Sequence, residues 1–334
     1  MGCPPIPAGA RCTKASQPTR APPSRARIPG HTGGLESLSW LLEFPQARLQ
    51  LSGGGLRAEI GSVQVMRDAD CTAFLQWALP QLDLHWRGFR KVRHQVCKRV
   101  RRRINALGLN GFESYRKCLE TDPREWPVLD QCCHVTMSRF FRDRGVFDGL
   151  RSSILPAIAE RARSEGRQAH CWSAGCASGE EPYSLRILWR AGVRNAGFGV
   201  ELSIMATDVD EALLDRARDG CYGQTSLHEV PPELVAQAFA QTGSRFCIRP
   251  QYREGVIFLK QDLRSQAPPG PFDLILCRNL AFTYFAPVLR QKTLAMFAER
   301  LVPNGFLVVG AHEQVRDARF VSAPGIPRTF MKTG

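Results

Sequence analysis

The chain has 334 residues, 43% of them hydrophobic and 23% charged, and a formal net charge of +14. These values are ordinary for a globular protein of two folded units plus a tail, with enough apolar residues for a core. No run approaches the roughly 18 apolar residues of a membrane span, and the N-terminus lacks the apolar core of a signal peptide. We therefore expect a cytoplasmic protein without membrane insertion, whose positive charge attracts acidic partners.

Twelve cysteines are spread along the chain with no secretory signal before them. This distribution predicts buried, reduced thiols and not a disulfide framework. The chain has no Cys-x-x-Cys pair, and Cys132-Cys133-His134 lacks a second pair at zinc-finger spacing, so we predict no metal site.

Residues 1–65 differ from the rest of the chain in amino-acid composition and periodicity. Pro, Arg, Gly and Ser dominate up to Gly34, and no sustained helical or strand period appears before residue 66. Two interpretations stay open, a disordered tail or an extension upstream of a true start at Met66.

Residues 66–150 are predicted to form a helical N-terminal domain and a linker. The longest helix is expected from Trp86 to Leu107, with apolar residues at steps of three or four and Gly108 as its C-cap. Shorter helices are predicted over 70–79, 111–119 and 136–150. The long helix carries nine basic residues with no acid among them: Arg87, Arg90, Lys91, Arg93, Lys98, Arg99, Arg101, Arg102 and Arg103. A solvated helix face, a docking surface for an acidic protein and a nucleic-acid contact remain alternatives, the last less favoured.

Residues 151–334 alternate between strand and helix patterns, which predicts an α/β fold with a mostly parallel, helix-covered sheet of Rossmann-like type. Strands are expected over 170–174, 202–207, 256–260, 274–277 and 306–310, and helices over 181–194, 211–218, 232–240 and 287–301. A short β-subdomain near 241–256 is expected outside the main sheet, because polar and apolar residues alternate there.

The first strand of this sheet runs into a glycine-rich loop and a helix. In such a sheet, ligands bind beyond the carboxyl ends of the strands, and Gly175 and Gly179 let the backbone approach a ligand. Glu180 and Glu181 follow, and two carboxylates repel a pyrophosphate but favour a cation. We therefore predict S-adenosylmethionine, with its amino and sulfonium groups, over NAD. The alternative is that both acids only begin the helix.

The other strand ends point to the same crevice. Asp208 is placed to accept hydrogen bonds from ribose hydroxyls, whereas Asp210 is expected to cap the next helix. Asp262 follows the third strand, where a side chain meets the adenine amino group. Arg278 and Asn279 follow the fourth strand.

Several blocks of the sequence resemble CheR-type (chemotaxis receptor) protein-glutamate methyltransferases. The blocks are Trp172–Ser184, Ala206–Asp210 and Phe272–Asn279, with a linker motif at Ser138–Asp143 and a helical-domain likeness over 92–119. The resemblance spans about residues 68–332. It implies a monomeric, S-adenosylmethionine-dependent enzyme that methylates receptor glutamates, with the basic helix meeting acidic receptor helices. Residues 245–252 resemble, in shortened form, the β-subdomain with which some members grip a receptor's C-terminal peptide.

The resemblance also implies roles for single residues. Glu181 would hold the cofactor's amino group, Asp208 its ribose, and Asp262 and Leu263 would flank its adenine. The implied cofactor-binding set is Ser138, Arg142, Ala174, Gly175, Glu181, Asp208, Asp262, Leu263, Arg278 and Asn279, and the implied catalytic set is Arg142, Arg278 and Tyr284. A glutamate acceptor has a pKa of about 4.3, so it is already deprotonated at neutral pH and needs alignment instead of a base.

Some positions depart from the family's pattern. Thr136-Met-Ser138 stands where relatives have Asn-x-Thr, Asp262 stands where they have Asn, Tyr284 lies one residue further on, and Ala311-His-Glu313 replaces Gly-His-Ser-Glu. The acceptor side has therefore changed more than the cofactor side. Two other functions stay open, a methyltransferase acting on another acceptor and a cofactor-binding regulator that binds nucleic acid.

Overall fold

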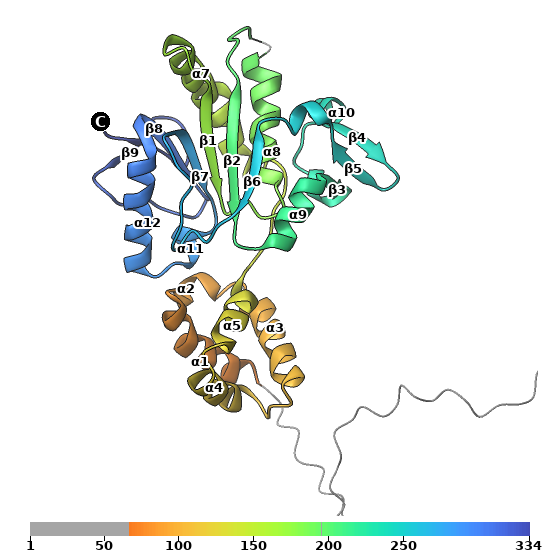
Figure 1. Ribbon diagram of the computed structural model, residues 1–334, viewed down its shortest axis with the longest axis vertical. Helices are drawn as coiled ribbons and strands as arrows, with labels where there is room; N and C mark the ends of the chain where they lie inside the picture. The colour runs from red at the N-terminus through yellow and green to blue at the C-terminus, as the bar shows by residue number, and fades with distance from the viewer. Residues whose placement is uncertain (1–66, 195) are drawn as a thin grey trace, which may run out of the picture. The chain divides into compact units, whose positions relative to one another are not determined.

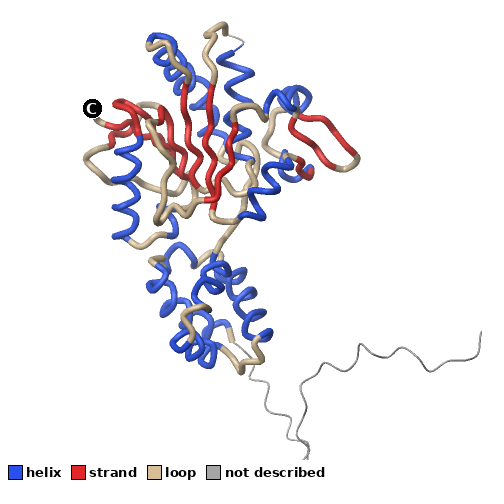
Figure 2. The backbone as a smooth tube through the Cα atoms, in the orientation of Figure 1, coloured by secondary structure: helices blue, strands red, loops and turns tan. Residues whose placement is uncertain are grey.

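The computed structural model describes residues 67–194 and 196–334, so the expectations for residues 1–65 lie outside it. Its main feature is a seven-stranded sheet in the order β6-β2-β1-β7-β8-β10-β9 (Figures 1 and 2). The strands are β1 (Ala169–Ala174), β2 (Leu202–Asp208), β6 (Val256–Lys260), β7 (Phe272–Cys277), β8 (Leu301–Val309), β9 (Phe320–Ser322) and β10 (Thr329–Lys332). The first five run parallel, and β10 is antiparallel to both β8 and β9. The predicted α/β, Rossmann-like class is confirmed.

Helices cover both faces of this sheet, because successive strand residues point to opposite sides. On β7, Leu274 and Leu276 share a core with α7 (Leu155–Ser164) and α8 (Glu180–Leu188). Ile275, between them, belongs to a core that includes α12 (Pro287–Arg300). A π-helical turn (Trp189–Arg194) extends α8, and α9 (Glu211–Asp219), α10 (Pro232–Ala238) and α11 (Ala281–Tyr284) complete this part. The order of the strands reverses beside β1, where the chain passes from β6 to β7, and this reversal creates the crevice expected at their carboxyl ends.

The expected β-subdomain is a three-stranded antiparallel sheet in the order β3-β5-β4, separate from the main sheet. Its strands are β3 (Cys221–Gly223), β4 (Phe239–Thr242) and β5 (Arg245–Ile248). The expected bounds 241–256 were too late along the chain, because β3 comes from a short segment just after α9 that carries no alternation of its own.

The helical region contains α1 (Asp68–Ala78), a 3-10 turn (Leu79–Leu82), α2 (Trp86–Phe89), α3 (Arg93–Ala106), α4 (Phe112–Thr121) and α5 (Glu125–Cys133). The prediction of one helix over 86–107 was wrong, because the chain turns between α2 and α3. Phe89 of α2 packs on Tyr284 of α11 with ring centroids 4.9 Å apart, and a Cβ on Gly88 would lie 2.2 Å from a carbonyl oxygen of α11. Gly108 ends α3 with φ of 66°, as expected.

Residues 136–150 were predicted to be helical throughout, and this was also wrong. The segment is extended up to residue 139 and becomes helical only in α6 (Arg144–Gly149), which leads through a π-helical turn (Leu150–Ile154) into α7. Phe141 and Asp143 have φ of 55° and 63°, which a helix excludes. The backbone N–H of Phe141 donates to the Ser184 hydroxyl (3.0 Å), which holds this linker on α8.

One apolar core runs from the helical region into the sheet. It includes Phe74 and Leu75 of α1 together with Trp172 of β1 and Phe297 of α12. Hydrogen bonds cross the same junction: His85 N–H donates to the carbonyl of Tyr284 (2.7 Å) and Ala286 N–H to that of Asp83 (2.8 Å).

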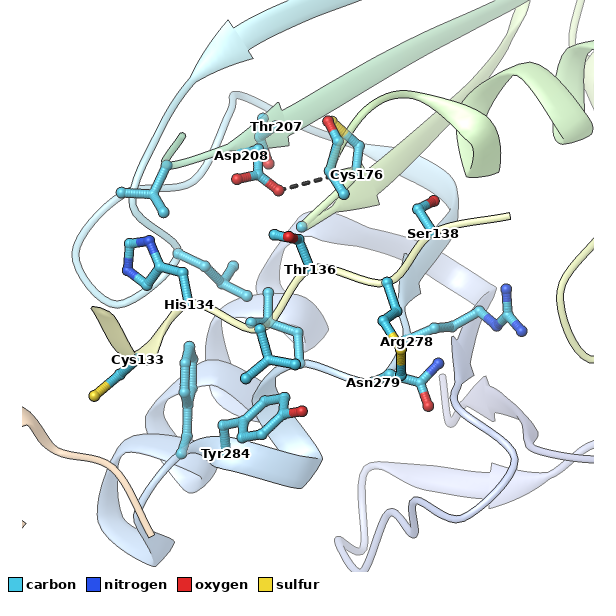
Figure 3. Close-up of a pocket in the computed structure, with 18 of the residues that line it drawn as sticks. Cys133, His134, Thr136, Ser138, Cys176, Thr207, Asp208, Arg278, Asn279 and Tyr284 are labelled. Carbon is cyan, nitrogen blue, oxygen red and sulfur yellow. Dashed lines mark hydrogen bonds between the residues drawn. The ribbon is translucent and has the colours of Figure 1, made fainter. Parts of the chain in front are cut away.

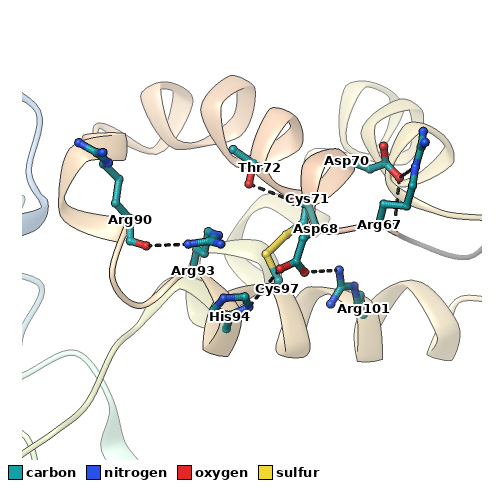
Figure 4. The surroundings of a disulfide bond; sticks show 10 residues. All are labelled: Arg67, Asp68, Asp70, Cys71, Thr72, Arg90, Arg93, His94, Cys97 and Arg101. Carbon is teal, nitrogen blue, oxygen red and sulfur yellow. Dashed lines mark hydrogen bonds and ion pairs between the residues drawn. A yellow bond between two sulfur atoms is a disulfide. The ribbon is translucent and has the colours of Figure 1, made fainter.

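The prediction of reduced thiols throughout was wrong for four cysteines. Cys71 and Cys97 form a disulfide that joins α1 to α3 (Figure 4). Cys221 and Cys247 form another between β3 and β5. In each pair the partners are 26 residues apart in sequence and become neighbours only through tertiary packing. The other described cysteines, namely Cys118, Cys132, Cys133, Cys171, Cys176 and Cys277, keep free thiols. Across residues 67–194 and 196–334, no helix is both long and apolar enough to cross a membrane.

A buried carboxylate on β7 fixes the edge of α7. The side chain of Asp273 is 1% exposed and accepts bonds from Arg161 (2.8 Å), Arg167 (2.8 Å) and the N–H of His170 (2.9 Å). Burial raises the pKa of Asp273, but the bonds from Arg167 and from the His170 N–H outweigh it, so the pKa lies below the ordinary 3.8. Its stabilising contribution is therefore complete above that value and is lost as the pH falls through the lower native pKa.

We expect Asp273→Asn to lower the free energy of unfolding by about 2–4 kcal/mol, because it leaves two arginines facing a neutral group in a buried site. Urea denaturation at neutral pH measures this. The matched control is Asp219→Asn, whose partner Arg245 lies 2.6 Å away with both side chains more than half exposed, and which should cost less than about 1 kcal/mol. Equal losses in the two variants would contradict the argument.

Candidate active site

A cavity lies at the carboxyl ends of β1, β2, β6 and β7, and the linker after α5 and the helix α11 close it (Figure 3). The sequence-predicted site residues that line it are Ser138, Arg142, Gly175, Glu181, Asp208, Asp262, Leu263, Arg278, Asn279 and Tyr284. Ala174 is the exception, since it is fully buried as the last residue of β1. The structure therefore gathers residues from five separated segments around one space.

The glycine-rich loop after β1 is tied to the end of β2. The N–H groups of Gly175 and Cys176 donate to the carbonyl of Thr207 (2.8 and 3.0 Å). The N–H of Ala177 donates to one oxygen of Asp208 (2.8 Å), and the N–H of Asp210 donates to the other (3.0 Å). Gly175 has φ of 80° and a Cβ there would lie 2.3 Å from Leu280, so only glycine fits.

Asp208 is held at the wall of the cavity with both oxygens partly satisfied by backbone. Burial raises the pKa of Asp208 above its ordinary value, although the two N–H bonds act in the opposite direction. Each oxygen keeps further acceptor capacity toward the cavity. Asp210 caps α9 as predicted, because its side chain accepts from the N–H groups of Ala212 and Leu213.

The two glutamates that begin α8 have different surroundings. Glu180 is 2% exposed and accepts the Ser178 hydroxyl (2.9 Å), so the expectation that both glutamates face a cation was wrong for Glu180. Its side chain therefore holds the glycine-rich loop and does not line the cavity. Glu181 does line the cavity, and it accepts bonds from the Ser173 hydroxyl (2.7 Å) and from Arg278 (3.1 Å).

Arg278 joins the end of β7 to the linker. Its guanidinium donates to the carbonyl of Arg142 (2.5 Å), to Asp143 (2.8 Å) and to Glu181, and it is 8% exposed. The Arg142 guanidinium itself donates to the carbonyl of Met137 (2.7 Å) across the linker. Two arginines therefore lie at one end of the cavity, Arg278 buried and bonded to three groups, and Arg142 partly exposed.

Tyr284 lies at the same end on α11, and burial raises the pKa of its hydroxyl. The loop that leads to it is fixed by Glu313, which is 4% exposed. Glu313 accepts the N–H of Asn279 (2.8 Å), the N–H of Gly310 (2.7 Å) and the hydroxyl of Thr283 (2.6 Å). Glu313 was not predicted as a site residue. The signal in the sequence was the stretch Ala311-His-Glu313, which departs from the family's pattern.

A chain of charged groups forms another part of the cavity wall. The carboxylate of Asp262 accepts bonds from Arg264 (2.7 Å), and Arg264 also holds both oxygens of Asp130 on α5 (2.9 and 2.7 Å). His134 Nε2 lies 3.4 Å from Asp130. Burial raises the pKa of Asp130, but His134 and Arg264 outweigh it and lower the pKa to about 2. Sequence reasoning missed Asp130 and Arg264 and considered His134 only as a zinc ligand.

Residues 136–324 match the family model of the CheR methyltransferase, SAM binding domain. The chain is 35% identical to a chemotaxis protein methyltransferase of Listeria monocytogenes, over 54% of this chain and 66% of the relative. It is 32% identical to a probable chemotaxis protein methyltransferase of Rhizobium etli, over 66% of this chain and 84% of the relative.

A third relative is longer. The chain is 30% identical to an uncharacterized 104.1 kDa protein of Rhodobacter capsulatus, over 66% of this chain but only 23% of that protein. The chain thus spans less than a quarter of one of the relatives that it matches. Since the family model covers more than half of the chain, including every strand of the main sheet except β10, the chain belongs to the CheR methyltransferase family and carries its S-adenosylmethionine-binding domain.

Proposed function

We propose that this chain transfers a methyl group from S-adenosylmethionine to a glutamate carboxylate of an acidic protein, of the chemoreceptor type. The observation that carries the proposal is the arrangement of one cavity. Carboxylates for a cationic, ribose-bearing cofactor lie on two of its walls, and Arg142, Arg278 and Tyr284 lie together at one end. The names of the Listeria and Rhizobium relatives support the same acceptor.

The residues present fit the cofactor. Asp208 offers acceptor capacity to two ribose hydroxyls, Glu181 offers a carboxylate to the amino group, and Leu263 offers an apolar wall to the adenine. Ser138 and Arg142 would complete the amino-acid end. When bound, S-adenosylmethionine supplies an activated methyl group. The residues of the chain would bind the cofactor, orient the acceptor and exclude water.

The acceptor end would position a carboxylate without removing a proton from it. Arg142 carries a partly exposed guanidinium that can orient an anion. Tyr284 keeps its proton at neutral pH, because the ordinary pKa of a tyrosine is about 10 and burial raises that of Tyr284 further. The apolar rings of Phe89 and Phe285, which also line the cavity, would exclude water from the acceptor oxygen. Arg278 would act less directly, because its guanidinium already holds Glu181 and the linker.

The basic surface proposed for docking is smaller than the nine residues of the sequence suggest. Arg99 donates to backbone carbonyls, Arg101 pairs with Asp68 and Arg103 pairs with Glu125, so these three serve the helical region itself. The exposed basic residues are Arg87, Arg90, Lys91, Lys98 and Arg102. We assign the contact with acidic protein helices to these five, since exposed like charges attract an acidic partner at modest desolvation cost.

The acceptor is tested by incubating the full chain with methyl-labelled S-adenosylmethionine and membranes that contain chemoreceptors. We expect label on a receptor, released as methanol by mild alkali, because a carboxyl methyl ester is base-labile. Alkali-stable label on another species would replace the acceptor, and cofactor binding with no transfer to any fraction would contradict enzymatic function.

We expect Asp208→Ala to weaken S-adenosylhomocysteine binding by about tenfold or more, because it removes the charged acceptor for the ribose. Isothermal titration calorimetry gives the dissociation constant, and thermal unfolding checks that the variant is folded. Asp215→Ala, an exposed carboxylate on α9, is the matched control and should bind like the unaltered chain. An unchanged affinity in folded Asp208→Ala would remove Asp208 from the ribose site.

Arg142→Ala should lower the rate of transfer by about 100-fold, since a preorganised charged donor contributes of this order. The dissociation constant for S-adenosylhomocysteine should change far less. Single-turnover transfer and calorimetry separate the two quantities. Arg144→Ala alters an exposed arginine two residues away and should leave both unchanged. Full transfer activity in Arg142→Ala would exclude Arg142 from the mechanism.

A further inference from the structure

The cavity has a histidine in its wall that the proposed function does not use. His134 follows α5 and lines the same space as Asp208 and Leu263. Figure 3 shows its imidazole on the side of the cavity where the carboxylate of Asp208 lies. The two groups interact electrostatically, because His134 contributes to lowering the pKa of Asp208 against the dominant effect of burial. His134 therefore lies in the part of the cavity wall near the carboxylate of Asp208.

The imidazole is held in place from behind. Its Nε2 lies 3.4 Å from Asp130, one helical turn earlier, and the side chains of His134 and Asp130 are 24% and 14% exposed. A carboxylate that is anionic at neutral pH only accepts hydrogen bonds, so the proton of the imidazole is placed on Nε2. Nδ1 is then the ring nitrogen available to a ligand in the cavity.

Asp130 is itself clamped across the junction between the helical region and the sheet. Arg264, in the loop after β6, donates to both of its oxygens and also to Asp262. This contact explains why position 262 is an aspartate where relatives have an asparagine. An aspartate neutralises the charge of Arg264, and an asparagine could not. The charges of Asp262, Arg264 and Asp130 thus form a rigid support for one imidazole.

We propose that His134 contacts the adenosine half of the bound cofactor, beside Asp208, and that Asp130 and Arg264 are positioning residues for it. The inference rests on the proposed function. It means that the segment leaving the helical region supplies a cofactor contact and does not only connect two parts of the chain.

The test measures two ligands on the full chain by calorimetry, S-adenosylhomocysteine and 5′-methylthioadenosine, which lacks the amino-acid end. We expect His134→Ala to raise both dissociation constants by the same factor, about threefold to tenfold for one hydrogen bond. Glu181→Gln should weaken only the first ligand. His228→Ala, an exposed histidine that does not line the cavity, is the matched control and should change neither.

The positioning role has its own readout. Asp130→Asn should weaken both ligands when His134 is present and have no further effect in the His134→Ala background, because the two residues act as one unit. An equal loss in both backgrounds would overturn this role. If the unaltered chain binds neither ligand, the proposed function fails. If it binds both and folded His134→Ala binds them equally well, only this inference is overturned.

Discussion

The hydrogen bonds and ion pairs of the buried Arg278 guanidinium are the interactions on which the candidate site depends. Removing a cation from water is costly, and the cost is offset here by three partners on two segments: Glu181 on α8, and the carbonyl of Arg142 and the carboxylate of Asp143 in the linker. The strand end, the helix start and the linker must therefore lie together for Arg278 to make these three contacts. Arg142 belongs to the same linker. The contacts of Arg278, which also holds Glu181 on the proposed cofactor side, therefore place Arg142 at the proposed acceptor end.

Backbone geometry fixes the rest of the cavity with few alternatives. Gly175 leaves no room for a side chain beside Leu280, and the loop that it begins donates its N–H groups to Thr207 and Asp208. On the acceptor side, Glu313 performs the corresponding task for the loop between Asn279 and Thr283. Two carboxylates, the half-buried Asp208 and the buried Glu313, each bonded mainly to N–H groups, thus shape two parts of the site.

The sequence predicted the parts of the site that lie on regular elements. The five parallel strands and the residues at their ends follow from hydrophobic pattern, and Asp208 and Glu181 are at predictable places because parallel strands end at a common edge. What it missed depends on contacts between distant segments. Nothing local distinguishes Glu180, which turns away to Ser178, from Glu181, which faces the cavity. The break before α3, the pairing of Arg264 with Asp130 and the two disulfides depend in the same way on tertiary packing.

The apolar core that passes from α1 into β1 and α12 has a consequence for cooperativity. A boundary near residue 150 separates a helical sequence pattern from an alternating pattern of strands and helices. Phe74 precedes this boundary and Trp172 and Phe297 follow it, yet all three lie in one continuous core. Removing the helices would expose this face of the sheet to water, so we expect the two parts to unfold as a single unit. If the proposed partner protein alters this shared core when it binds the helical region, it would change the affinity for the nucleoside by some factor. The nucleoside would then change the affinity for that protein by the same factor.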